Sequence, residues 1–193
     1  MPRQKTFNEK EVLKNATDLF WKNGFHQTSI QDLVDKLAVN RASLYDTYKD
    51  KEGLFNQCFC LYRDLVIQSI DDIFSNEKTI KDGFNSLFNF VIQTITNQEK
   101  KGCLISNTYS ELLPTPNPDT ITLLDDTRKL WVEALKSKLN QAKKQKEINK
   151  NINISKTSEA MYSSIVGISI LAKTNVEKKT LKNAIDFYLD IFN

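Results

Sequence analysis

Apolar residues recur every three to four positions along most of the chain, which is the spacing that gathers them on one face of an α-helix. Only five glycines and four prolines interrupt this pattern, and no β-branched segment alternates for long between apolar and polar residues. The pattern therefore predicts an all-α fold of about nine helices.

Helix boundaries near the N-terminus follow from two capping boxes and a glycine. Thr6 and Glu9 have the spacing of the first box, and Gly24 occupies the position where a left-handed residue ends a helix. Thr28 and Gln31 have the spacing of a second box ahead of another apolar stripe. We expect one helix from Thr6 to Gly24 and a short second helix after Thr28.

A third and a fourth helix follow after breaks of about three residues. Asn40 is expected to cap a helix from position 41 to about 48, and Asp50 a long helix to about 74. Two short helices joined by a tight turn over residues 28–48 are typical of a helix-turn-helix, whose second helix enters the major groove of DNA.

Longer helices are predicted beyond residue 78. An apolar stripe runs from Ile80 to Ile95, and prolines between 114 and 118 end the short helix that follows. The remaining predicted helices cover about 104–112, 119–145, 155–173 and 177–192. We expect two domains, one at 1–50 that contains the helix-turn-helix and one at 51–193 that contains the longer helices.

Composition narrows the function classes. The net charge of +3 is compatible with nucleic-acid binding but does not indicate it alone. No apolar run reaches the roughly 18 residues of a membrane helix, and the N-terminus lacks a secretory pattern, so we expect a cytoplasmic protein. With three cysteines and one histidine, no metal site, cofactor or enzymatic activity is predicted.

The segment from Gly24 to Leu54 resembles the DNA-binding signature of the TetR family of transcriptional regulators. It has the glycine after the first helix, a capping threonine, a valine in the turn, the trio Ser43-Leu44-Tyr45 and a lysine before the long helix. The resemblance implies that bases or adjacent phosphates are contacted by Arg41, Ala42, Ser43 and Tyr45. It implies that the DNA backbone is clamped by Thr28, Gln31, Tyr48 and Lys51.

The chemistry of these side chains agrees with such roles. Arg41 can bind guanine O6 and N7 with both arms of its guanidinium, and Ala42 is small enough to approach a thymine methyl group. For Tyr45 and Tyr48, packing between helices is the alternative interpretation. Ala42 replaces a glycine common in the family, and Asp46 is unusually acidic, so the preferred DNA sequence does not follow from the resemblance.

The segment from Gly102 to Asn107, followed by Glu111 and Leu112, resembles a TetR subgroup in which some members sense electrophiles or oxidants through a cysteine. The resemblance implies, as one alternative, that Cys103 is the sensing cysteine, with Lys100 and Lys101 lowering the pKa of its thiol. The other alternative is that Cys103 is a small buried apolar residue.

Aromatic residues on apolar helix faces predict a pocket for a small hydrophobic effector, although core packing is the alternative for most of them. The predicted pocket residues are Phe59, Tyr62, Phe84, Phe88, Cys103, Tyr109, Trp131 and Tyr162.

Small residues on the penultimate helix and an apolar stripe on the last one predict a four-helix interface between two copies. The interface residues are Ser163, Ser164, Gly167, Ile168, Leu171, Leu181, Ile185 and Tyr188, with packing inside one chain as the alternative. We therefore expect a homodimeric repressor that binds palindromic double-stranded operator DNA and is released by a small hydrophobic ligand. The alternatives are release by modification of Cys103 and, more remotely, a helical enzyme or carrier that does not bind DNA.

Overall fold

The computed structural model describes residues 7–96, 101–114 and 118–192, and in these ranges the chain is all-α, as predicted. Nine α-helices and one final 3₁₀ helix account for the regular structure of these ranges. Their bounds are α1 Glu9–Asn23, α2 Ile30–Leu37, α3 Arg41–Tyr48, α4 Lys51–Ser75, α5 Ile80–Ile95, α6 Leu104–Leu112, α7 Pro118–Gln145, α8 Ile154–Leu171, α9 Lys178–Asp186 and η1 Phe187–Phe192.

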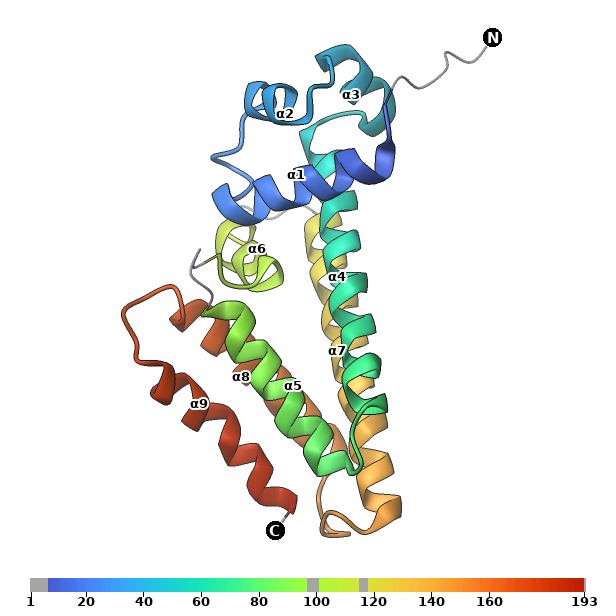
Figure 1. Cartoon of the computed structure of the whole chain (residues 1–193), viewed down its shortest axis with the longest axis vertical. Coiled ribbons are helices and arrows are strands. Elements are labelled where there is room, and N and C mark those ends of the chain that lie inside the picture. The colour runs from blue at the N-terminus through green and yellow to red at the C-terminus, as the bar shows by residue number, and fades with distance from the viewer. Residues whose placement is uncertain (1–6, 97–100, 115–117, 193) are drawn as a thin grey trace.

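The helices form two groups at opposite ends of α4 (Figure 1). Helices α1 and α3 pack on the first turns of α4, α2 packs on α1 and α3, and the rest of α4 packs against α5 and α7. Helix α8 packs on α7, α9 lies against α5 and α8, and α6 contacts both α1 and the larger group. None of the helices in the described ranges has the length and apolar character needed to cross a membrane.

Two predicted helix starts were wrong by one or more residues. Helix α1 is capped by Asn8, whose side chain accepts hydrogen bonds from the Lys10 and Glu11 amides, while Thr6 lies outside the described residues. Helix α2 is capped by Ser29 in a reciprocal box with Asp32, in place of the predicted pair Thr28 and Gln31. The hydroxyl of Thr28 instead donates to the Gly24 carbonyl at 2.6 Å, and the Thr28 side chain is buried.

The other predicted boundaries in this region are confirmed. Asn40 accepts the Ser43 amide at 2.8 Å, and Asp50 accepts the Gly53 amide at 2.7 Å. Gly24 ends α1 with a φ of 85°, a conformation that glycine adopts without steric strain. Helix α9 ends earlier than predicted, because the chain tightens into a 3₁₀ helix from Phe187.

Edge-to-face aromatic contacts join the helices inside each group. Phe20 of α1 meets Phe55 of α4 with ring centroids 5.2 Å apart, and Phe74 of α4 meets Phe84 of α5 at 5.1 Å. Because burying an aromatic side chain removes a large apolar area from water, these contacts anchor α4 in both groups. The long helix therefore connects the N-terminal helices to the larger bundle.

Candidate functional site

The end of the molecule formed by α2 and α3 presents one helix face to solvent. Leu44 and Tyr48 lie one turn apart on α3 and are both 2% exposed, so they hold this helix against its neighbours. The opposite face carries Arg41, Ala42 and Asp46, which are exposed, and is free to meet a partner.

Arg41 and Tyr45 are organised as a pair on this face. The Arg41 Nη2 donates to the Tyr45 hydroxyl at 3.2 Å, and its guanidinium carbon lies 5.4 Å from the centre of the Tyr45 ring. A guanidinium supported in this way loses less conformational freedom when it binds a base edge. Ser43 is half-buried, and its amide is occupied by the Asn40 cap.

The four residues expected to clamp a DNA backbone are placed differently from one another. Gln31 is exposed, and its amide donates to Asp35 one turn later. Thr28 and Tyr48 are buried, and burial raises the pKa of Tyr48 to about 12. Of these three side chains, only Gln31 faces the solvent beside α3.

The Lys51 side chain is hydrogen-bonded to backbone carbonyls within the protein. Its ammonium donates to the carbonyls of Phe25 at 2.9 Å and Thr28 at 3.0 Å, and it lies 4.2 Å from the centre of the Phe25 ring. Burial lowers the pKa of Lys51, and the charge of Glu111 acts in the opposite direction. Two of the three ammonium donors of Lys51 thus fasten α4 to the segment between α1 and α2.

Lys49 was not among the predicted contacts, yet it is exposed directly after α3. Its φ of 71° turns the chain between α3 and α4, and it adds a positive charge at the end of the exposed face. The short connection between Tyr48 and Lys51 could have identified this position from the sequence, because a residue that joins two closely spaced helices stays at the surface.

A carboxylate from α6 joins the two groups of helices. Glu111 accepts hydrogen bonds from the amides of Phe25 at 3.0 Å and His26 at 2.6 Å. A Cβ at Gly24 would lie 2.7 Å from a carboxylate oxygen of Glu111, so a larger residue there would force the Glu111 carboxylate to shift. The sequence motif includes Glu111 but does not indicate this contact, because the residues that Glu111 binds lie 85 or more positions away.

Two further contacts cross the same boundary. The indole N–H of Trp21 donates to the Gly102 carbonyl at 3.1 Å, and the Lys101 ammonium lies 2.7 Å from a carboxylate oxygen of Asp18. Helix α1 is therefore held to α6 and to the segment before it by charged and neutral hydrogen bonds.

An apolar cleft of about 30 Å³ lies between α4, α5, α7 and α8. It is lined by Tyr62, Val66, Phe90, Val91, Thr94, Ile95, Cys103, Trp131, Ile165 and Ser169. Sites for small organic molecules have volumes of about 300 to 1,000 Å³, so this cleft must widen to admit one. Three of the predicted pocket residues, Tyr62, Cys103 and Trp131, line it.

The remaining predicted pocket residues divide into two sets. Tyr109 and Tyr162 lie behind the cleft, where their hydroxyl oxygens are 3.1 Å apart and Tyr162 packs against Trp131. Phe59, Phe84 and Phe88 belong to the core instead, because they are at most 2% exposed. The aromatic neighbours of these three are Phe55 for Phe59, Phe74 and Phe192 for Phe84, and Tyr188 for Phe88.

The cysteines differ in accessibility. Cys103 is partly exposed, and its sulfur lies 3.8 Å from the Tyr62 hydroxyl. Cys58 is buried, and this burial raises its pKa to about 12, which keeps its thiol protonated and unreactive at neutral pH. Lys101 is engaged by Asp18, and Lys100 lies outside the described residues. Within the described ranges, no three His, Cys, Asp or Glu residues are grouped closely enough to hold a metal ion.

Some of the residues predicted to form a dimer interface are exposed, and others are buried within the protomer. Ser163 and Leu171 are exposed on α8, and a Cβ added at Gly167 would meet no atom within 4 Å. Ser164 is half-buried and hydrogen-bonded to the Tyr188 hydroxyl at 2.8 Å. Three residues expected at the interface, Ile168, Leu181 and Ile185, are at most 3% exposed and pack inside the protomer. Exposed apolar residues that the prediction omitted are Ile170 and Phe187, the latter 69% exposed.

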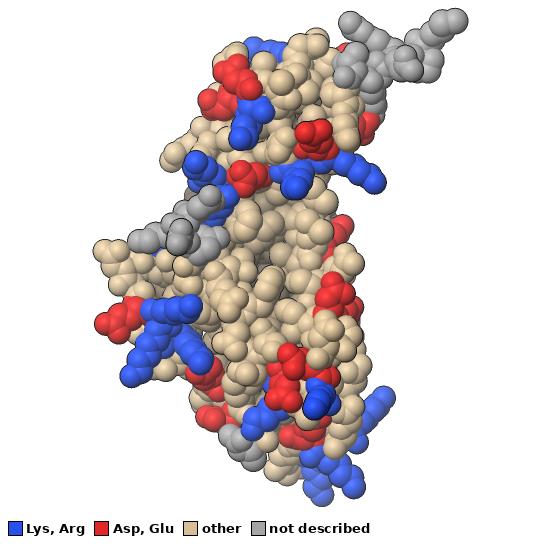
Figure 2. Space-filling view, viewed as in Figure 1, with Lys and Arg blue, Asp and Glu red and all other residues tan. Residues whose placement is uncertain are grey.

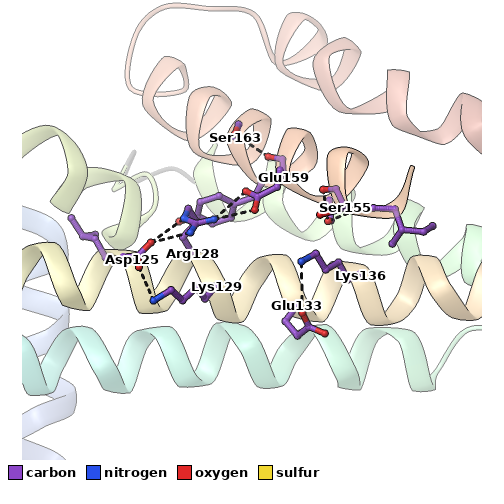
Figure 3. Close-up of polar contacts among 12 residues, drawn as sticks. Asp125, Arg128, Lys129, Glu133, Lys136, Ser155, Glu159 and Ser163 are labelled. Carbon is purple, nitrogen blue, oxygen red and sulfur yellow. Dashed lines mark hydrogen bonds and ion pairs between the residues drawn. The ribbon is translucent and has the colours of Figure 1, made fainter. Parts of the chain in front are cut away.

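An ion pair joins α8 to α7, and further ion pairs lie along α7 itself (Figure 3). The guanidinium of Arg128 on α7 binds Glu159 on α8 at 3.0 Å and Asp125 on its own helix, also at 3.0 Å. Lys129 adds a second contact to Asp125 at 2.7 Å. Of these pairs, Arg128–Glu159 is the one that joins α7 to α8, and because both groups are partly exposed it stabilises this contact only modestly.

Comparisons with known proteins agree with this architecture. The family model described as "Bacterial regulatory proteins, tetR family" matches residues 12–58. The chain is 27% identical over 195 residues to the uncharacterized HTH-type transcriptional regulator YezE of Bacillus subtilis, covering 100% of both proteins. It is 26% identical to the HTH-type transcriptional repressor ComR of Escherichia coli, covering 93% of this chain and 86% of ComR.

Solved structures show the same fold. A cysteine mutant of the TetR-family regulator CifR, complexed with 26-base-pair operator DNA, superposes with a TM-score of 0.81 at 19% identity, covering 99% of this chain and 100% of CifR. The reduced form of NemR from Escherichia coli superposes with a TM-score of 0.84 at 16% identity, covering 95% and 96%.

Proposed function

Because this chain is a transcriptional regulator of the TetR family, we propose that it is a repressor that binds palindromic operator DNA as a homodimer. The observation that carries the proposal is the exposed face of α3, on which Tyr45 supports the guanidinium of Arg41. The name of ComR as a repressor and the operator complex of CifR support the same function.

On this proposal, α3 lies in the major groove with its N-terminal end toward the bases. Arg41 binds a guanine edge, Ala42 approaches a thymine methyl group, and Tyr45 positions Arg41 or donates to a phosphate. Lys49 and Gln31 contact the backbone on either side. Asp46, which a phosphate would repel, faces a cytosine amino group or the groove.

Dimerisation through α8 and α9 supplies the second recognition helix. The open space over Gly167 and the exposed Leu171 on α8, together with the exposed Phe187 directly after α9, leave apolar surface uncovered in the protomer. Such a surface on a soluble protein is typical of an interface. Two copies related by a twofold axis would place their α3 helices about 34 to 36 Å apart, which matches one turn of DNA.

The effector we propose is a small hydrophobic or aromatic molecule that enters the apolar cleft beside Trp131. The cleft contacts Cys103, which immediately precedes α6, and α6 carries Glu111 against the N-terminal helices. Widening the cleft therefore displaces α6 and with it the support of α1. The protein releases DNA if the effector binds the conformation with α6 displaced more tightly than the DNA-bound conformation.

The direct test is binding of the purified protein to DNA from upstream of its own gene, with a scrambled duplex as control. We expect protection of a palindrome with half-sites one helical turn apart and an affinity that falls steeply with salt, because phosphate contacts release counterions. Equal affinity for both duplexes would contradict the proposed function.

Modification of Cys103 is a second candidate for the releasing event. Its partial exposure, its contact with Tyr62 and its place on the cleft favour this candidate. An electrophile such as N-ethylmaleimide forms a bond from the thiolate sulfur to its alkene carbon, and the adjacent carbon takes a proton from water. The adduct would fill the cleft as a bound effector does.

A cysteine variant tests this candidate. We expect N-ethylmaleimide to release DNA from the wild-type protein and from Cys60→Ser, but not from Cys103→Ser. Unchanged release from Cys103→Ser would rule out this trigger while leaving the DNA-binding function intact.

A further inference from the structure

A second, polar cleft lies at the boundary between the two groups of helices. Its volume is about 360 Å³, which is within the range of small-molecule sites. It is lined by Trp21, Lys22, Asn23, Gly24, Gln27, Lys101, Asn107, Ser110, Glu111 and Lys173. These residues come from the end of α1, the segment before α6, α6 itself and the residues after α8, so the cleft spans both groups. Figure 2 shows Lys and Arg side chains at this boundary.

Some charged side chains of the polar cleft have a charged or hydrogen-bonding partner, and others have no ion-pair partner among the described residues. The Lys101 ammonium is paired with Asp18 at 2.7 Å, and both carboxylate oxygens of Glu111 accept backbone amides. The ammonium of Lys173 contacts only the neutral amide oxygen of Asn107, at 3.2 Å. In the described ranges neither Lys22 nor Lys173 has a carboxylate partner.

Lys22 and Lys173 stand on different sides of the boundary. Lys22 belongs to the last turn of α1, and Lys173 follows α8 by two residues. Between them the cleft offers the partly exposed indole of Trp21, the Ser110 side chain and the Asn107 amide as neutral contacts. This set suits a ligand with two negative groups separated by a short organic body.

We propose that this cleft binds a small organic anion with two or more carboxylate or phosphate groups, two of which bridge Lys22 and Lys173. It is a separate site from the apolar cleft at Trp131, and its existence does not depend on the proposed repressor function. The bound anion fastens α1 to α6 and α8. If it changes the affinity for DNA, then DNA changes the affinity for the anion by the same factor.

The two tryptophans of the chain allow the two clefts to be observed separately. Trp21 lines the polar cleft and Trp131 lines the apolar one, so Trp131→Phe leaves Trp21 as the only tryptophan, which can be excited selectively over the tyrosines. Titrating this variant with citrate and with fructose 1,6-bisphosphate tests the carboxylate and phosphate forms of the ligand. Potassium chloride at matched ionic strength controls for screening. We expect a saturable change in Trp21 fluorescence with at least one anion and none with chloride.

If Trp131→Phe does not fold, isothermal titration calorimetry on the chain with both tryptophans measures anion binding instead. Lysine variants then test whether the anion binds in this cleft. We expect Lys22→Gln and Lys173→Gln each to weaken anion binding by about tenfold, the size of one charge-assisted hydrogen bond. Lys179→Gln, which removes an exposed lysine of α9 away from the cleft, should bind as the wild type does. A response no larger than that to chloride, or unchanged affinity in both cleft variants, would overturn the proposal and leave these lysines as countercharges to the helix ends.

Discussion

At the scale of single residues, Glu111 makes the contact that most directly joins the two groups of helices. Its carboxylate accepts two backbone amides at the end of α1, and hydrogen bonds to a charged group contribute about 1.5 to 3 kcal/mol. We expect Glu111→Gln to lower the free energy of unfolding by about 1 to 3 kcal/mol, because the amide side chain retains only one acceptor oxygen.

Urea denaturation measures this change, and Glu133→Gln is the matched control. Glu133 is 76% exposed, and its oxygen lies 3.9 Å from the Lys136 ammonium, so its loss should shift stability by less than about 0.5 kcal/mol. Equal effects of the two substitutions would show that Glu111 contributes no more than a surface carboxylate.

Residue roles could be predicted from sequence only where one side chain had one plausible partner. Asn40 and Asp50 each stand alone before a helix, and both cap it as expected. Thr28 and Ser29 are adjacent hydroxyl residues, each followed three positions later by an acceptor, Gln31 or Asp32. The burial of Thr28 against Gly24 decides between them, and burial depends on contacts that local spacing does not specify.

At the scale of elements, periodicity identified the helices but not what covers each apolar face. The stripe of α9 was expected to face a second copy, yet Leu181 and Ile185 are covered by the same chain. Phe84 and Phe88 were expected in a pocket and lie in the core for the same reason. A repeat of 3.6 residues shows that a face is buried, whereas the identity of the covering surface is a property of the tertiary structure.

The exposed face of α8 gives a prediction about dimerisation. A Cβ at Gly167 meets nothing within 4 Å in the protomer, so Gly167→Leu should leave the fold intact and raise helix propensity. If a partner helix approaches closely at this position, the added side chain will separate the two copies. We expect the dimer dissociation constant to rise by at least about tenfold, a cost of about 1.4 kcal/mol.

Sedimentation equilibrium measures the association, and circular dichroism checks the fold. Ser137→Leu, at an exposed position of α7, adds a leucine away from this face and should not change association. A monomer–dimer equilibrium that is unchanged by Gly167→Leu would exclude close helix packing at Gly167.

At the scale of the whole molecule, the two groups of helices are joined more closely than a domain boundary at residue 50 suggests. Lys51 begins α4, but its ammonium binds carbonyls of the N-terminal group, and Glu111 reaches the same segment from α6. The division into 1–50 and 51–193 remains a prediction. No local pattern in the sequence encodes these long-range contacts, which on the proposed function would carry a change in the apolar cleft to the segment between α1 and α2.

The proposed repressor function requires the exposed face of α3 to contact the base edges of operator DNA. Fluorescence anisotropy on the upstream duplex should show that Arg41→Ala and Tyr45→Ala weaken specific binding by about 10- to 100-fold, because one bidentate base contact contributes about 1 to 3 kcal/mol. Lys144→Ala, which removes an exposed lysine near the end of α7, serves as the control and should bind as the wild type does. Wild-type affinity in both α3 variants would contradict the account.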